Sequence, residues 1–116
     1  MSKAQNKITG MVGEDLATEY LESIGYRILK RNLSYNFGEI DILAQSKDGT
    51  IVIVEVKTVL GSGWGQAQDL VRHKKQQKLR LLASAIEKDF PDRDIRIDVI
   101  AVDQGKIKHL ENAVEG

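Results

Sequence analysis

The sequence predicts an α/β domain in which helices flank a mixed central sheet. Two segments carry apolar residues at helical spacing and are predicted helices. The segments between and after them either alternate apolar with polar residues or are continuously apolar, as in strands. The longer helix, at residues 69–88, separates the third and fourth predicted strands and is long enough to be a crossover, so these two strands should be parallel neighbours. The length of 116 residues fits one domain, at residues 1–116, with a single modest core.

The predicted elements follow one another without a linker or repeat. In order, they are a helix at 7–23, strands at 26–33, 37–45 and 51–58, a helix at 69–88, and strands at 95–102 and 106–110. Gly25 ends the first helix, since glycine is favoured just after a helix. The Asp48-Gly49 pair predicts a hairpin turn between the second and third strands. The second strand should place Ile40 on the same face as Ile42 and Ala44.

Composition narrows the class of protein. Hydrophobic residues make up 41% and charged residues 29%, as in ordinary globular proteins. The chain contains no cysteine, so it has neither a disulfide framework nor a thiolate metal site. Residues 1–10 are polar, and no apolar run approaches the ~18 residues that span a bilayer, so we expect a cytoplasmic protein with no membrane partner. The formal net charge is zero, but residues 72–80 hold five Lys or Arg and no acid, which is a local cationic stripe.

Charged side chains interrupt the apolar third strand, IVIVEVKT. Glu55 and Lys57 are two positions apart and therefore point to the same face. A two-residue turn at Asp48-Gly49 would place Asp41, on the preceding strand, opposite residue 56. A bulge, or a turn shifted by one residue, would bring Asp41 level with Glu55 or Lys57. Two carboxylates and an amine are expected to converge there.

This group of residues has a chemical use. Asp41, Glu55 and the backbone carbonyl of Val56 would offer hard oxygen ligands to Mg²⁺ or Mn²⁺. Such an ion polarises a phosphodiester, and Lys57 could orient the attacking water or stabilise charge on the pentacoordinate phosphorus. The alternative is a structural ion-pair network on an exposed face of the sheet. Clustered charges inside apolar strands favour the metal site.

Asp41 followed by Glu55-Val56-Lys57 resembles the D…ExK signature of PD-(D/E)XK nucleases. GEID at 38–41 and VEVKT at 54–58 are more similar still to the bacterial YraN-like family. Further positions of that family's pattern are Gly13-Glu14, then Gly25, Tyr26, Ile28, Leu29, Arg31 and Asn32, then Val71, Lys75 and Gln76, then Arg96, Asp98, Val99, Ile100 and Val102. The resemblance covers residues 10–103.

The resemblance implies a restriction-endonuclease-like αβββαβ core, similar to Holliday-junction resolvases. It implies that Glu14 completes the metal site and that Lys75 and Gln76 contact phosphate. Arg72 and Lys78 share a side of the second helix with Lys75 and extend a phosphate-binding stripe, unless this is only a solvated helix face. Arg31 completes the set of residues that we expect to contact nucleic acid.

For three other residues, the sequence allows two roles each. Asp98, which alternates with apolar neighbours, supports the site from behind or faces solvent, and Glu39 is an outer ligand or a surface charge. Trp64 is expected to pack over the edge of the core, with base stacking as the alternative. His73 and His109 lack ligand spacing and are assigned to no metal.

The sequence therefore predicts a Mg²⁺-dependent DNA endonuclease acting on branched or damaged DNA, with catalytic residues Glu14, Asp41, Glu55 and Lys57. Branched DNA comes from the resolvase resemblance, and so does a homodimer, because junctions have two-fold symmetry. One alternative is a non-catalytic nucleic-acid-binding module with a degenerate metal site. Another is a protein-interaction domain with no role at nucleic acids.

Overall fold

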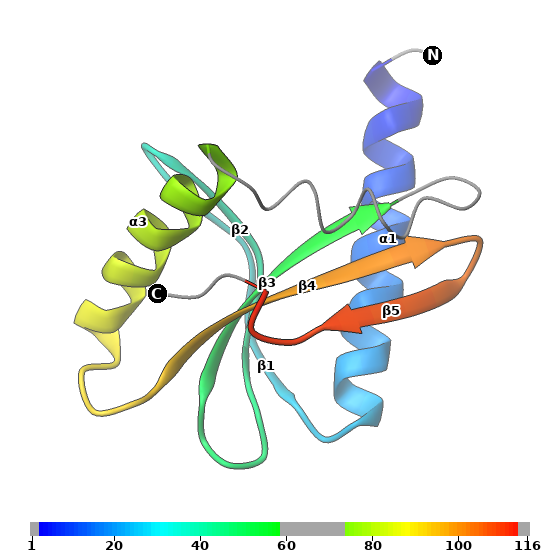
Figure 1. Cartoon of the computed structure of the whole chain (residues 1–116). Coiled ribbons are helices and arrows are strands. Elements are labelled where there is room, and N and C mark those ends of the chain that lie inside the picture. The colour runs from blue at the N-terminus through cyan, green and yellow to red at the C-terminus, as the bar shows by residue number, and fades with distance from the viewer. Residues whose placement is uncertain (1–2, 59–73, 114–116) are drawn as a thin grey trace.

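A computed structural model describes residues 3–58 and 74–113, with side chains at 12–58 and 77–113. A five-stranded sheet lies between two helices, one on each face (Figure 1). The elements are α1 (Lys3–Ser23), β1 (Arg27–Tyr35), β2 (Gly38–Gln45), β3 (Ile51–Thr58), α3 (Lys74–Asp89), β4 (Ile95–Asp103) and β5 (Lys106–Leu110). Neither described helix is long and apolar enough to cross a membrane.

The strands lie in the sheet in chain order, β1-β2-β3-β4-β5. All neighbouring pairs are antiparallel except β3 and β4, which are parallel. The predicted crossover is thus confirmed, and α3 belongs to it. The order α-β-β-β-α-β is the core that the family resemblance implies, and β5 extends it by one strand.

The predicted element bounds agree closely with those observed. Strands β3 and β5 have the predicted limits, while β1 and β4 extend further, to Tyr35 and Asp103. The helix α1 begins at Lys3, earlier than its apolar periodicity indicates. Residues 69–73 of the second predicted helix, which include Arg72, lie outside the described residues, as do Trp64 and His73.

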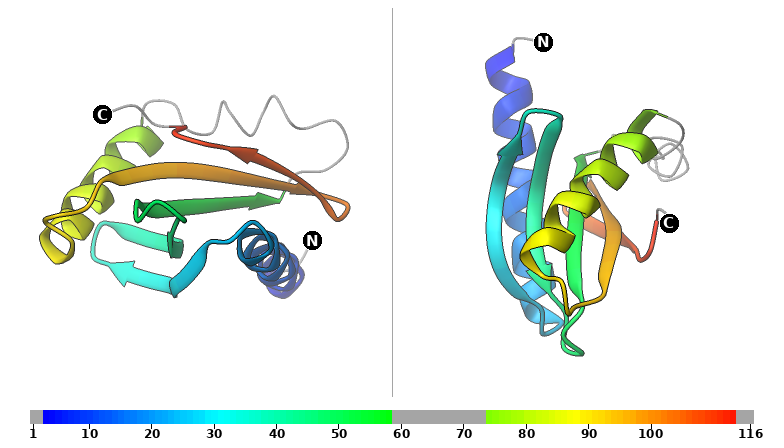
Figure 2. Two further views of the ribbon diagram at one scale, coloured as in Figure 1. Left: turned by 90° about the horizontal axis from the view of Figure 1, so that it is seen from below. Right: turned by 90° about the vertical axis from the view of Figure 1, so that its left-hand side faces the viewer.

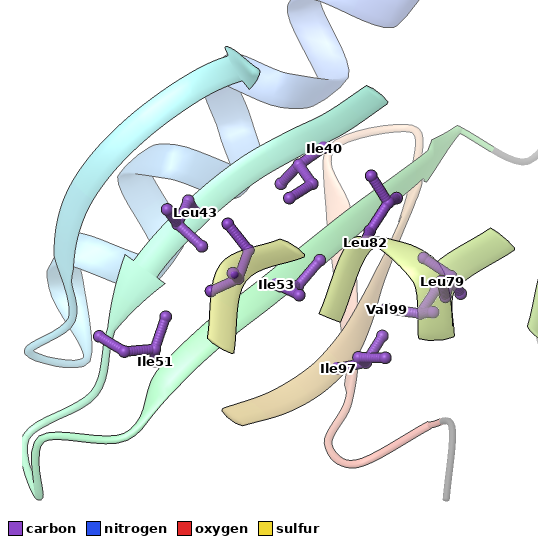
Figure 3. Packing of buried hydrophobic residues seen from close by; sticks show 9 residues of the cluster. Ile40, Leu43, Ile51, Ile53, Leu79, Leu82, Ile97 and Val99 are labelled. Atoms are coloured by element: carbon purple, nitrogen blue, oxygen red, sulfur yellow. The ribbon is translucent and has the colours of Figure 1, made fainter. Parts of the chain in front are cut away.

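The sheet is packed on both faces. On the α3 face, isoleucines and leucines of the strands meet Leu79, Leu82 and Ile86 of the helix (Figure 3). On the α1 face, Ala17 and Leu21 pack against Ile42, Val52 and their neighbours. Because both faces are covered, β3 is apolar on both sides over its first four residues, and these four are fully buried. From Glu55 onward, the residues of β3 are half-buried.

The β2–β3 hairpin has a three-residue loop, not the two-residue turn predicted from Asp48-Gly49. The Ser46 amide donates to the carbonyl of Thr50 at 2.9 Å, and the Gly49 amide donates to the carbonyl of Ser46 at 3.0 Å. Gly49 has a φ of 92°, which completes the turn in the left-handed region that glycine tolerates best. The register therefore shifts by one residue, so that Ile42 faces Val54, which is the last regular pair before Asp41 and Glu55.

The regular alternation of β2 breaks at Asp41. Ile42 and Ala44 pack on the α1 face, but Ile40 packs on the α3 face, so the predicted common face is wrong for Ile40. Opposite this point, between the pairs Arg31–Ile42 and Leu33–Ile40, Asn32 of β1 has a φ of 54°. The irregularity of both strands lets the Asp41 side chain leave the normal position of a strand residue.

Candidate active site

Asp41 is fixed by a hydrogen bond to the neighbouring strand. The backbone amide of Val56 donates to Oδ2 of Asp41 at 2.9 Å, beyond the last regular β2–β3 pair at Ile42 and Val54. A side-chain carboxylate thus takes the place that a backbone carbonyl would occupy in the ladder. The carbonyl of Val56 points to the same side as its amide, because both groups of a strand residue face one neighbour. Asp41 and the Val56 carbonyl are therefore on the same side of β3.

Asp41 and Glu55 line one cavity, of about 130 Å³, between the sheet and α3. The apolar lining consists of Ile40, Ile53, Val54, Leu79 and Leu82, and the polar lining of Glu39, Asp41, Glu55 and Lys78. Pockets for organic ligands are typically ~300–1,000 Å³, so this cavity is sized for an ion and its waters. Asp41 and Glu55 thus line the same cavity, and their joint role in a metal site stays a prediction.

Glu14 approaches from α1, which is held unusually close to β3. A Cβ atom on Gly13 would lie 2.5 Å from Oγ1 of Thr58, so only glycine allows this contact. The next residue, Glu14, keeps only 16% of its side chain exposed, and its Oε1 has no hydrogen-bond partner among the described residues. Burial, and then the negative charge of Asp41, raise the pKa of Glu14, and Arg31 opposes this only in part.

A divalent cation fits these residues. A buried carboxylate oxygen without a donor is unfavourable, and a second carboxylate nearby makes its charge more so. A hard cation would relieve both, and oxygen donors are what Mg²⁺ and Mn²⁺ select. Within the described ranges, no three Asp, Glu, His or Cys side chains are already grouped closely enough to enclose an ion. The charge of Asp41 acts on Glu14, and Asp41 lines a cavity together with Glu55.

Lys57 follows Glu55 on the same face of β3 and is half-buried. It is not among the described residues that line the cavity and so lies beyond its edge. The fourth predicted catalytic residue is thus near the carboxylates along the strand, in line with Ala101 of β4.

Of the residues on α3 that are predicted to contact nucleic acid, the structure describes the side chain of Lys78 but not those of Lys75 and Gln76. Lys78 is exposed, and its aliphatic chain lies over Gly38, where an added Cβ would meet Cε of Lys78. This position brings Lys78 from α3 to the cavity rim. Lys75 and Gln76 lie on α3, but their side chains are outside the described residues.

Arg31 faces α1. Its Nη2 is 2.9 Å from Oδ1 of Asp15 and 3.8 Å from Oε1 of Glu14, and one third of its side chain is exposed. Its Nε is buried without a hydrogen-bond partner among the described residues. Arg31 thus holds the acidic side of α1 against β1, and its contact with nucleic acid stays a prediction.

Comparison with known proteins identifies the family. Residues 13–102 match the model of "Uncharacterised protein family UPF0102". The chain belongs to this family. UPF0102 is the YraN-like family that the sequence resembles, and the matched range contains every candidate site residue.

Relatives in this family extend over almost the whole chain. A UPF0102 protein of Persephonella marina is 42% identical over 110 residues, which are 93% of this chain and 94% of that protein. The UPF0102 protein THEYE_A1950 of Thermodesulfovibrio yellowstonii is 48% identical over 109 residues, 90% of this chain and 93% of that protein. Among solved structures, a repair endonuclease from Pyrococcus abyssi is similar with a TM-score of 0.49 and 13% identity, over 87% of this chain and 38% of that one. This UPF0102 chain thus corresponds to little more than one third of that endonuclease.

A buried polar network on the α1 face of the UPF0102 chain was missed by the sequence interpretation. Asp98 is fully buried, so the solvent-facing alternative is wrong. Arg96 donates to both carboxylate oxygens of Asp98, at 2.8 and 2.9 Å, and also to the hydroxyl of Tyr26, at 2.6 Å. His109 Nε2 is 2.7 Å from Oδ2 of Asp98, and its Nδ1 is 3.1 Å from the hydroxyl of Tyr20.

The network is electrostatically satisfied. Burial alone would raise the pKa of Asp98, but hydrogen bonds from His109, from Arg96 and from the backbone amide of Asn112 together hold this pKa below its ordinary value. The carboxylate is therefore ionised and paired. The spacing Arg96-x-Asp98 within an apolar strand was the available signal, because residues two apart share a face.

Proposed function

We propose that this UPF0102 protein is a Mg²⁺- or Mn²⁺-dependent endonuclease that hydrolyses phosphodiester bonds of DNA. The observation that carries the proposal is the largely buried Glu14 carboxylate, whose Oε1 accepts no hydrogen bond from the described residues and whose pKa is raised in part by the charge of Asp41. Asp41 in turn shares a small cavity with Glu55. An arrangement of acids that is unfavourable alone is favourable around a cation. When bound, the ion supplies Lewis-acid polarisation of the phosphodiester and a water of lowered pKa.

The chain's own residues have distinct roles in this proposal. Glu14, Asp41, Glu55 and the Val56 carbonyl hold the ion, and the Val56 amide keeps the Asp41 carboxylate in position. Lys57 donates to the attacking water or to the phosphoryl oxygens as negative charge grows there. Lys78, at the cavity rim, binds a phosphate next to the one that is cut.

The finer parts of the proposal concern substrate and assembly. Branched or damaged DNA is the proposed substrate, from the resemblance to resolvases. A homodimer is proposed for the same reason, since a two-fold symmetric junction matches a two-fold symmetric protein.

A cleavage assay tests the proposed function. Labelled branched and linear DNA are incubated with the protein and Mg²⁺ or Mn²⁺, and products are followed over time. We expect cutting that falls about 100-fold or more in Glu55→Gln and in Lys57→Ala, as for loss of one charge-stabilising group at an active site. Glu87→Gln, an exposed acid on α3, is the matched control and should cut normally.

Two results would contradict this proposal. Binding that weakens steeply with salt, without any cutting, indicates a non-catalytic nucleic-acid-binding module. Cutting that persists unchanged in Glu55→Gln indicates a contaminating nuclease or another site.

A further inference from the structure

Two aromatic side chains stack at the tip of the β1–β2 hairpin. The ring centroids of Tyr35 and Phe37 are 5.4 Å apart, and the ring planes differ by 14°. Tyr35 also packs against the apolar cluster on the α3 face, whereas 41% of Phe37 is exposed. One ring is thus anchored in the fold, and it holds the other in a defined orientation at the surface.

This pair lies on the same face of the sheet as the candidate active site. Gly38 and Glu39 alone separate Phe37 from Ile40, and Glu39 and Ile40 both line the cavity. Four strand residues span about 13 Å, so Phe37 is a few nucleotides from Asp41 on a bound strand. The tip of this hairpin and the first turns of α3 lie at the same end of the molecule, opposite the β2–β3 hairpin (Figures 1 and 2).

A cation lies between the aromatic pair and the cavity. The chain of Lys78 covers Gly38, the residue that follows Phe37, and Lys78 also lines the cavity. Of the three acids that line the cavity, Glu39 is the one nearest to Phe37 in sequence, and it accepts a hydrogen bond from Ser34 at 3.3 Å. A flat apolar ring next to a lysine is the combination that binds single strands, since bases stack on the ring and the cation contacts phosphate.

We propose that Phe37, backed by Tyr35, is a stacking platform for an unpaired base, so that the substrate of the neighbouring site is DNA with a single-stranded or extrahelical nucleotide close to the cut. Bases inside an intact duplex have both faces covered by their neighbours, and only an unpaired base can offer a face to Phe37. That the DNA is cut near the unpaired base rests on the proposed nuclease function. That the base binds at Phe37 rests only on the aromatic pair.

Binding without divalent ions tests the platform independently of cleavage. The full chain is titrated, in the presence of EDTA, into a fluorescein-labelled single-stranded oligonucleotide and into a fully paired duplex of the same sequence, and anisotropy is recorded. We expect Phe37→Ala to weaken single-strand binding about tenfold, as for loss of one base–aromatic stack, and to change duplex binding by less than about twofold. Phe37→Trp should restore single-strand binding, and Phe37→Leu should not, because only the π-face is missing.

Ile24→Ala is the matched control. Ile24 is a similarly exposed apolar residue, at 37%, and it precedes Gly25, which contacts Lys47 of the opposite hairpin. This variant should bind both DNAs like the parent chain. Thermal melting of each variant checks that it is folded, and size-exclusion chromatography checks its self-association.

Each outcome decides the inference. It is overturned if the chain binds neither DNA, if Phe37→Ala weakens both DNAs equally, if Phe37→Leu binds like the parent, or if Phe37→Ala changes only self-association. Failure of the proposed nuclease is a different result, namely no metal-dependent cutting by the parent chain while the selective effect of Phe37→Ala persists. Conversely, cutting that depends on Glu55 with no selective effect of Phe37→Ala retains the nuclease and removes the platform.

Discussion

At the scale of single residues, the proposed metal ligand Glu14 is also a group whose charge is unfavourable in the folded chain. Its pKa is raised above the ordinary 4.5, mainly by burial and then by Asp41, so the folded state holds this proton more tightly than the unfolded state does. Stability is therefore highest below pH 4.5 with respect to this group, and it declines as the pH rises through the raised pKa. Among the described residues, none donates a hydrogen bond to Oε1 of Glu14, and a buried polar atom of this kind is consistent with a bound ion.

Replacing Glu14 should stabilise the chain. In Glu14→Gln we expect a melting temperature a few degrees above that of the parent at pH 8 without metal, and a difference that disappears near pH 4. Differential scanning calorimetry at both pH values measures this, with Glu22→Gln, an exposed acid of the same helix, as control. A Glu14→Gln variant less stable than the parent at pH 8 would contradict the view that burial and the charge of Asp41 outweigh the attraction of Glu14 to Arg31.

Asp98 should behave in the opposite way. Because its pKa is held below 3.8, it contributes stability that is fully present above about pH 4 and is lost as the pH falls through the lowered pKa. Asp98→Asn leaves Arg96 and His109 without their carboxylate, and we expect a loss of about 3 kcal/mol in the free energy of unfolding at pH 7. Urea denaturation measures it, and Asp92→Asn, an exposed aspartate, should change little.

At the scale of elements, the contact between α1 and β3 positions the site. Gly13→Ala in an ordinary helix would stabilise by about 0.5–1 kcal/mol. Here the added methyl group would meet Oγ1 of Thr58, so we expect destabilisation of about 1–3 kcal/mol and weaker Mn²⁺ binding, since Glu14 moves with the helix.

A double variant identifies the cause. Gly13→Ala combined with Thr58→Ala removes the clashing oxygen and should recover most of the lost stability and Mn²⁺ affinity. Urea denaturation and calorimetric titration of Mn²⁺ report the two quantities. If the double variant is as impaired as Gly13→Ala alone, close packing at Thr58 is not what holds α1 in place.

Element order could be predicted from the sequence, but local register could not. The apolar run of β3 and the length of the second helix sufficed for the strand order and for the parallel β3–β4 pair. The Asp48-Gly49 pair suits both a two-residue and a three-residue loop, and only the hydrogen bonds of Ser46 distinguish them. Likewise, alternation alone could not show that β2 changes face at Asp41, where Asn32 of the neighbouring strand has a positive φ.

At the scale of the whole molecule, the candidate site draws its groups from α1, β2 and β3, and thus from both sides of the sheet. That Asp41 and Glu55 line one cavity follows from their places on neighbouring strands, and spacing along the sequence indicated that they lie near one another. The place of Glu14 depends on how a helix docks, and the family resemblance supplied it. The Asp98 network joins residues 70 and 89 positions apart, as in Arg96–Tyr26 and His109–Tyr20, and no local pattern reports such contacts.

The most direct test of the account is a crystal of the protein soaked in saturating Mn²⁺, with the ion located by its anomalous scattering. We expect one strong peak about 2.1 Å from carboxylate oxygens of Asp41 and Glu55, with Glu14 turned toward it. A crystal with no peak there, or with Mn²⁺ bound only elsewhere, would contradict the assignment of these acids to a metal site.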